Sequence, residues 1–212
     1  MDDNQVEAER TLEEEMATAK SRLQTFLEYR EMTDMDEIGR RKFVNNAFDG
    51  VLTMVGVVMG SYVAGVTDPA VVISTGVTTS MAIGVSGFWG AFISEKAERK
   101  RELDDLGKAL LSDLSETKQA RAGHVASWVV SAVDGLSPFL AAFFVVLPFL
   151  FTALVGNIDY IYYASISFAL IFLFGLGVFT GSVGRDNIIG SGLKMVVAGV
   201  VCIALSFLLN VS

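Results

Sequence analysis

Hydrophobic residues in this chain gather in long runs, and short polar connections separate the runs. Five runs are long enough to cross a bilayer, because about 20 helical residues, each rising about 1.5 Å, span a hydrocarbon core of about 30 Å. The predicted membrane-spanning helices cover residues 43–66, 70–94, 125–156, 160–183 and 188–211. The third run is overlong and contains Pro138 and Pro148, so we expect it to be kinked or partly broken, or to begin before the bilayer.

The distribution of basic residues predicts the orientation of these helices. Every Lys and Arg lies in residues 1–42, in residues 96–121, or at Arg185 and Lys194. Because basic residues favour the cytosolic side, the N-terminus and the connection between the second and third spans are predicted to be cytosolic. Five spans then place the C-terminus outside.

Residues 1–42 are predicted to form a cytosolic amphipathic helix. Apolar residues recur at helical spacing along this segment, at Leu12, Met16, Ala19, Leu23, Phe26 and Leu27. Such a helix lies on a membrane surface or packs on a partner helix. A ferritin-like iron-oxidising site needs Glu-x-x-His pairs, and this segment contains no histidine, so we exclude that alternative.

Composition narrows the class of protein further. Hydrophobic residues make up 52% of the 212 residues, and the mean hydropathy is +0.50, which predicts an all-α polytopic membrane protein with five transmembrane helices. The net charge of −8 argues against a nucleic-acid partner and fits the attraction of cations. The acidic N-terminus lacks the apolar segment of a signal peptide, which favours a prokaryotic plasma membrane.

The sequence lacks the motifs of disulfide-rich proteins, thiolate metal clusters and nucleotide-binding enzymes. Cys202 is the single cysteine and lies in an apolar run, so neither a disulfide framework nor a thiolate metal cluster is expected. Phosphate-binding and dinucleotide-binding motifs are missing, and His124 is the single histidine. We therefore expect neither an enzyme nor a tightly bound cofactor.

An acidic residue lies in the first third of the first predicted span. A carboxylate inside a membrane is costly, so Asp49 is expected to face a partner, a cavity or an ion path. A hydrogen-bonded position near the lipid headgroups, without further function, is the alternative.

Two further residues extend this candidate ion path: Met81 on the second span and Asp134 on the third. A carboxylate with a thioether suits Fe²⁺ or Mn²⁺, because the soft sulfur discriminates against Mg²⁺ and Ca²⁺. Met81 as ordinary apolar filler and Asp134 as a packing residue remain open alternatives.

A second group of carboxylates follows the second span, within residues 95–124. If one helix continues through Gly107, six carboxylates share an arc of roughly 80°: Glu95, Glu98, Glu102, Asp105, Asp113 and Glu116. A solvated helix face usually mixes charges of both signs, so a stripe of one sign beside a membrane predicts a cation collector. A merely acidic helix face is the alternative.

Two motifs resemble the vacuolar iron transporter family, which includes iron and manganese carriers of yeast. The motifs are Asp49-Gly50-Val51-Leu52 on the first span and Ser80-Met81-Ala82-Ile83-Gly84 on the second, and the resemblance covers about residues 40–211. It implies a homodimer whose first spans line the ion path at the two-fold axis, with Asp49 and Met81 along the path. By spacing, the family's cytoplasmic metal-binding glutamates correspond to Glu102, Asp105, Asp113 and Glu116.

The chain departs from the family pattern at two places. Val85 stands where the family often has a glutamate after the second motif. The connection between the second and third spans is also shorter than in plant members, which implies a reduced metal-binding domain at residues 95–124.

Taken together, the pattern and the resemblance predict a dimeric transporter that exports Fe²⁺ or Mn²⁺ from the cytosol in exchange for protons. Its expected parts are a cytosolic N-terminus (1–42), spans 1 and 2 (43–94), an acidic cytosolic segment (95–124) and spans 3 to 5 (125–212). A membrane scaffold that docks a cytosolic partner and a passive cation channel are the alternatives.

Overall fold

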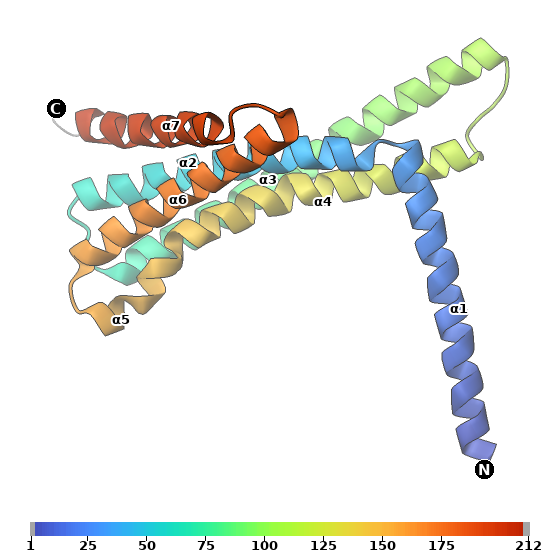
Figure 1. The fold of residues 1–212 in the computed structure, drawn as a ribbon, viewed down its shortest axis with the longest axis horizontal. Helices are drawn as coiled ribbons and strands as arrows, with labels where there is room; N and C mark the ends of the chain where they lie inside the picture. The colour runs from blue at the N-terminus through green and yellow to red at the C-terminus, as the bar shows by residue number, and fades with distance from the viewer. Residues whose placement is uncertain (1–2, 210–212) are drawn as a thin grey trace.

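The computed structural model describes residues 3–209, and the side chains of residues 16–208 (Figure 1). Within that range all regular structure is helical, as predicted. The elements are α1 (Asp3–Met32), α2 (Met35–Val63), α3 (Pro69–Leu110), α4 (Lys118–Val146), the 3₁₀ helix η1 (Leu147–Phe151), α5 (Thr152–Val155), α6 (Ile158–Gly184) and α7 (Ile188–Leu209).

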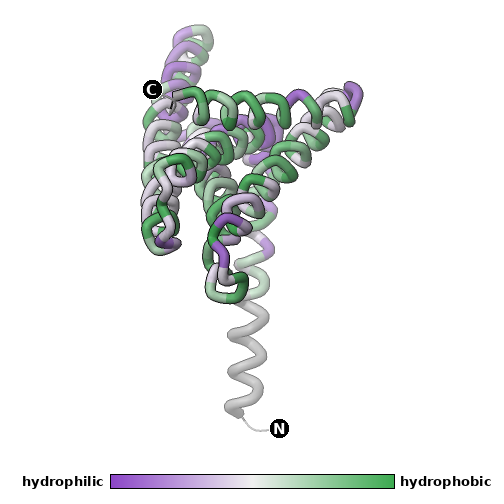
Figure 2. The backbone as a smooth tube through the Cα atoms, turned by 90° about the vertical axis from the view of Figure 1, so that its left-hand side faces the viewer, coloured by the Kyte–Doolittle hydropathy of each residue, from purple (hydrophilic) through white to green (hydrophobic). Residues whose placement is uncertain are grey.

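The prediction of five membrane-spanning segments is confirmed for the described residues. They are α2, α3, α4 with η1 and α5, α6, and α7, and each is long and apolar enough to cross a bilayer. Figure 2 shows apolar residues along these helices and polar residues on the part of α3 that projects beyond the bundle. The chain is therefore an integral membrane protein.

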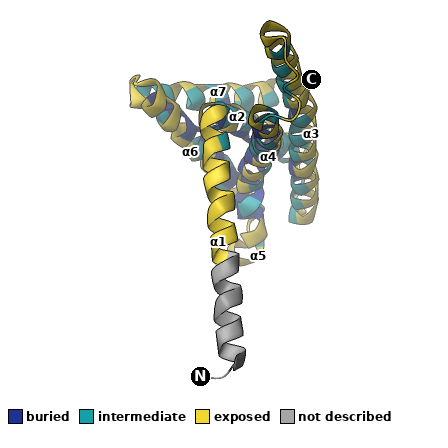
Figure 3. Cartoon of the chain, turned by 90° about the vertical axis from the view of Figure 1, so that its right-hand side faces the viewer, coloured by how far each residue is buried: buried dark blue, intermediate teal, exposed yellow. Residues whose placement is uncertain are grey.

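The bundle is organised around α4, which lies between α2 and α3 (Figure 3). Glycines bring the backbones together at both contacts. A side chain on Gly50 of α2 would clash with the backbone of Pro138, and a Cβ atom on Gly135 would lie 2.6 Å from the carbonyl oxygen of Gly84 on α3. Small residues are typical of membrane helices that pack this closely.

The apolar core fills the space between α2, α4 and α6, where large side chains are fully buried. Polar groups in this core are paired. The hydroxyl of Tyr162 donates to the carbonyl oxygen of Val66 at 2.9 Å, and the hydroxyl of Ser165 donates to that of Val145 at 2.5 Å. The core therefore contains hydrogen-bonded polar groups, as the hydrocarbon region requires.

The third span begins earlier than residue 125 and is broken near its end, as its length and its prolines predicted. Helix α4 begins at Lys118, well before residue 125, and it continues through Pro138. The break falls at Pro148, where η1 replaces the α-helix. Gly156, with a φ of 74°, then reverses the chain into α6.

The expected helix through residue 116 is wrong. Helix α3 ends at Leu110, and Leu111 has a φ of 51°, in the left-handed region that ends helices. The side-chain oxygen of Thr117 then accepts from the backbone N–H of Ala120 and caps α4. Residues 95–124 are thus the end of α3, a turn and the start of α4.

The N-terminal segment is divided near Asp34. This residue has a φ of 49°, and an ion pair of 2.8 Å between Arg30 Nε and Asp36 spans the break. Residues 35–42 therefore belong to α2. Helix α1 runs crosswise to the long axes of the bundle helices (Figure 1).

Candidate metal-transport site

Asp49 lies on a face of α2 that is exposed among the described residues. Its neighbour Gly50 is buried against α4, and one residue turns a helix by about 100°, so the Asp49 side chain points away from α4 and is exposed. Within the described part of the chain, its carboxylate makes no hydrogen bond or ion pair. Asn45, Thr53, Gly56 and Gly60 share this face, which we call the open face of α2.

Met81 has the corresponding position on α3. Ser80 is fully buried, and its hydroxyl donates to the carbonyl oxygen of Gly76 at 2.7 Å. The next residue, Met81, is 56% exposed. The thioether is therefore not filler in the core of the single chain.

A close approach between α2 and α3 indicates that Asp49 and Met81 lie at the same depth in the bundle. A Cβ atom on Gly76 would lie 3.4 Å from the sulfur of Met54, so these residues of α3 and α2 are level. Helices α2 and α3 run in opposite directions. Asp49 and Met81 are each five residues from this contact, about 7.5 Å along their helices and toward the same end.

The packing of α4 gives the same result independently. Gly84 of α3 contacts Gly135, and Gly50 of α2 contacts Pro138, three residues further along α4. Three residues back along α3 from Gly84 is Met81, which therefore lies level with Pro138 and Gly50. The two predicted residues of the ion path form one layer.

The described residues of a single chain do not complete a metal site at this layer. Among the described residues, no three of His, Cys, Asp and Glu gather closely enough to hold a metal ion. One carboxylate and one thioether on the surface leave most of a metal ion's coordination positions to other groups.

Asp134 is placed differently from the other two predicted residues of the path. It is 8% exposed and lies at the seam between α4 and α2. The side-chain amide of Asn46 donates to its carboxylate, and Lys42 Nζ lies 3.5 Å from the same oxygen. The carboxylate is thus neutralised by groups of α2 and is not on the open face.

Sequence reasoning missed the role of Lys42. Lys42 and Asn46 are four residues apart, so they share one side of α2. This spacing could have indicated that both side chains face the same partner. The predicted start of the span at residue 43 separated Lys42 from the membrane segment. In the structure it belongs to α2 and reaches Asp134.

The predicted acidic stripe is shorter than expected and partly paired. Asp113 and Glu116 lie beyond the end of α3, so only four of the six carboxylates remain on one helix. Arg99 Nη2 lies 3.4 Å from a carboxylate oxygen of Glu95. Lys108 Nζ lies 3.2 Å from a carboxylate oxygen of Asp105. The stripe is therefore not an unpaired surface of one sign.

Asp113 stabilises the turn between α3 and α4. Its carboxylate accepts a hydrogen bond of 2.9 Å from the backbone N–H of Ser115. This bond holds the pKa of Asp113 below its usual value, because it favours the charged form. The structure thus gives Asp113 a local role in the turn.

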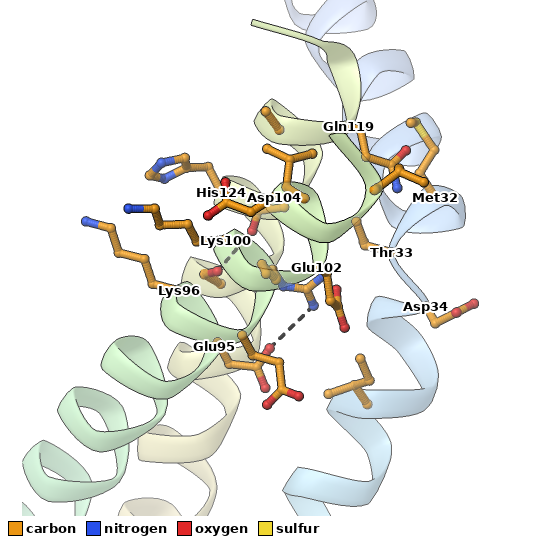
Figure 4. A pocket seen from close by; sticks show the side chains of 18 of the residues that line it. Met32, Thr33, Asp34, Glu95, Lys96, Lys100, Glu102, Asp104, Gln119 and His124 are labelled. Atoms are coloured by element: carbon orange, nitrogen blue, oxygen red, sulfur yellow. Dashed lines mark hydrogen bonds and ion pairs between the residues drawn. The ribbon is translucent and has the colours of Figure 1, made fainter. Parts of the chain in front are cut away.

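Three predicted acids line a hollow of about 660 Å³ between the α1–α2 turn, α3 and α4 (Figure 4). They are Glu95, Glu98 and Glu102. Charges of both signs line the hollow: Asp34, Glu95, Glu98, Glu102 and Asp104 are acidic, and Arg41, Lys96, Arg99 and Lys100 are basic. This hollow can hold polar solutes, but its charge is nearly balanced.

Comparison with known proteins finds a matching family and a similar archaeal protein. The sequence profile of the VIT family matches residues 108–210, from the end of α3 into the C-terminus. An uncharacterized protein of Methanocaldococcus jannaschii is 32% identical over 177 residues, which covers 82% of this chain and 90% of that protein.

Proposed function

Because the chain belongs to the VIT family, whose members transport metal ions across membranes, we propose that it exports Fe²⁺ or Mn²⁺ from the cytosol in exchange for protons. The metal ion is a transported substrate. The observation that carries the proposal is the exposed Asp49 carboxylate, level with Met81 in the membrane-spanning part of the bundle.

A carboxylate facing lipid is costly, by a few kcal/mol on insertion scales, so the open face of α2 needs a cover. A second copy of the chain fits this requirement best. Gly56 and Gly60 lie on the same face, and a Cβ atom on either would meet no atom within 4 Å. A homodimer through α2 would bring two backbones close at these glycines and two Asp49 carboxylates to the symmetry axis.

Such a dimer supplies the ligands that one chain lacks. Two carboxylates carry the charge that a divalent ion needs, and two Met81 sulfurs favour Fe²⁺ or Mn²⁺ over the harder Mg²⁺ and Ca²⁺. Main-chain carbonyl groups and water would complete the shell.

Exchange for protons follows from the same chemistry. A carboxylate binds a metal ion only when it is deprotonated, so proton and metal compete for the Asp49 pair. A site that opens alternately to each side can therefore carry metal in one direction and protons in the other. Coupling of this kind makes the protein a secondary transporter.

The direction of transport rests on the charged end of the bundle. The positive-inside rule places the basic residues of this end, and with them the hollow between α3 and α4, in the cytosol. Glu98 and Glu102 would attract cations there before they enter the membrane. The near balance of charge in the hollow makes this a modest effect.

Transport is tested with the purified protein in proteoliposomes. Uptake of Fe²⁺ and Mn²⁺ is compared with that of Zn²⁺, Mg²⁺ and Ca²⁺, and a pH dye inside the vesicles reports proton movement. Selective, uphill metal flux with opposite proton flux is expected. Flux without proton movement would identify a passive channel, and no flux from folded protein would favour a scaffold that docks a partner.

The dimer is tested by filling the open glycines. Gly56→Leu should shift the protein from dimer to monomer in detergent while the helix content remains unchanged. Gly175→Leu is the matched control, since Gly175 on α6 also has open space around it. An unchanged dimer in Gly56→Leu would contradict the proposed interface.

A further inference from the structure

The described side chains of α1 include an exposed apolar face. Met16, Leu23, Phe26 and Leu27 are 63%, 58%, 37% and 43% exposed. At about 100° per residue, they share an arc of about 100° with Ala19, and we call these five residues the α1 stripe. Figure 3 shows the exposure of the described part of α1. Leu12, predicted on the same side, lies outside the described side chains.

The base of α1 meets the bundle where its surface changes from charged to apolar. Tyr29 packs against a small cluster that includes Met35 and Ala126. Ala126 lies at the start of the apolar part of α4, and the exposed Trp128 follows it and packs on Phe92 at 4.6 Å between ring centroids. Trp residues are enriched at membrane–water interfaces, so the exposed Trp128 indicates that the base of α1 lies at the level of the lipid headgroups.

An ion pair fixes the rotation of α1 about its own axis. Glu28 lies 2.9 Å from Lys118, the first residue of α4, which is farther from the membrane than Ala126. The Glu28 side of α1 therefore faces away from the membrane. The centre of the α1 stripe lies about 150° around the helix from Glu28, so the stripe faces the membrane side.

Basic residues flank the stripe. Lys20 and Arg22 are exposed, and helical geometry places them on opposite edges of the stripe. Neither makes an ion pair within the described part of the chain. Long basic side chains at the edges of an apolar face can reach lipid phosphates while their methylene groups stay in apolar contact.

From these four observations we propose that α1 lies on the bilayer surface as an interfacial helix. The stripe enters the headgroup region, and Lys20 and Arg22 contact lipid phosphates. Helix α2 begins three residues after α1 ends, so lipid contact by α1 also constrains the tilt of α2 in the membrane. This inference does not depend on which metal the protein carries.

The test measures the depth of two positions on α1 in the full-length protein. Leu23→Cys and Thr25→Cys are each made with Cys202→Ala and labelled with an environment-sensitive fluorophore. The protein is placed in nanodiscs that contain spin-labelled lipid as a quencher. Thr25 is the matched control, because it lies on the opposite side of the same helix turn and is exposed.

The proposal predicts that lipid quenches the Leu23 probe at least about twofold more than the Thr25 probe, since only the stripe enters the headgroup region. Lys20→Glu with Arg22→Glu should reduce quenching at Leu23 in bilayers of phosphatidylglycerol. Equal, weak quenching at both positions would overturn the proposal. So would a Leu23 probe that is shielded equally in detergent and in lipid, which would identify a second copy of the chain as the cover.

Discussion

Asp49 on α2 and Asp134 on α4 are both carboxylates within membrane-spanning helices, but the chain surrounds them differently. Asp134 is buried, and Lys42 and Asn46 both contact one of its carboxylate oxygens. Asp49 is exposed, unpaired within the described residues, and level with the exposed Met81. A paired carboxylate can hold two helices together, whereas an unpaired carboxylate remains able to bind an ion.

The comparison teaches that the residue type alone does not mark an ion path. What distinguishes the two acids is the supply of positive charge and hydrogen bonds from the neighbouring helix.

Asp49→Asn should abolish coupled transport, a loss of at least about a hundredfold, because the amide has no charge for a divalent ion and no proton to exchange. The measurement is Mn²⁺ uptake into proteoliposomes with equal amounts of folded protein. Thr53→Val, on the same open face one turn away, is the control and should retain transport. Normal uptake by Asp49→Asn would remove Asp49 from the ion path.

Met81→Leu should lower Fe²⁺ and Mn²⁺ transport by about tenfold and weaken discrimination against Mg²⁺, since the soft ligand is lost while the volume is kept. Met59→Leu is the matched control. Met59 is 1% exposed in the core of α2, so its thioether lies away from the open face. Equal behaviour of the two variants would contradict a ligand role for Met81.

Glu98→Gln together with Glu102→Gln should raise the KM for metal about twofold to fivefold without lowering the maximal rate, because these acids act only by attraction. The difference in KM should shrink at high salt, because dissolved ions then screen the attraction between charges more than about 10 Å apart. Asp113→Asn should leave KM unchanged, because the Asp113 carboxylate serves the turn before Ser115. A lower maximal rate in the double variant would indicate direct participation in transport.

Asp134→Ala should leave the transport rate per folded protein nearly unchanged but lower the free energy of unfolding by about 1–3 kcal/mol, because Lys42 loses its partner. Denaturation of the purified protein in detergent measures this. Lys42→Met should destabilise it too, and the double variant should lose less stability than the sum of the two single variants. Additive losses would contradict the pairing.

Much of the architecture could be predicted from the sequence, because membrane helices are marked by long apolar runs. The five spans followed from such runs, and the early start and break of the third span followed from its length and its prolines. The helical N-terminus followed from apolar residues at helical spacing. The end of α3 did not. A continuous helix through residue 116 satisfied the charge pattern, but α3 ends at Leu110, because Leu111 adopts the left-handed conformation, and Thr117 then caps a new helix, α4.

The site could be predicted only in part for a related reason. A carboxylate within an apolar run indicated Asp49, and a thioether on the next span indicated Met81; packing contacts put the two at one level. The sequence could not show that Lys42 reaches Asp134, since this contact depends on how α2 and α4 pack. Nor could the sequence show that Arg99 and Lys108 pair with acids of the predicted acidic stripe.

The most direct test of the central claim is Mn²⁺ binding by the purified protein, followed by electron paramagnetic resonance of the free ion. The account predicts one Mn²⁺ site per two chains, lost in Asp49→Asn and retained in Asp134→Asn. Unchanged binding in Asp49→Asn, or loss of the site in Asp134→Asn alone, would show that the open carboxylate is not the one that holds the ion.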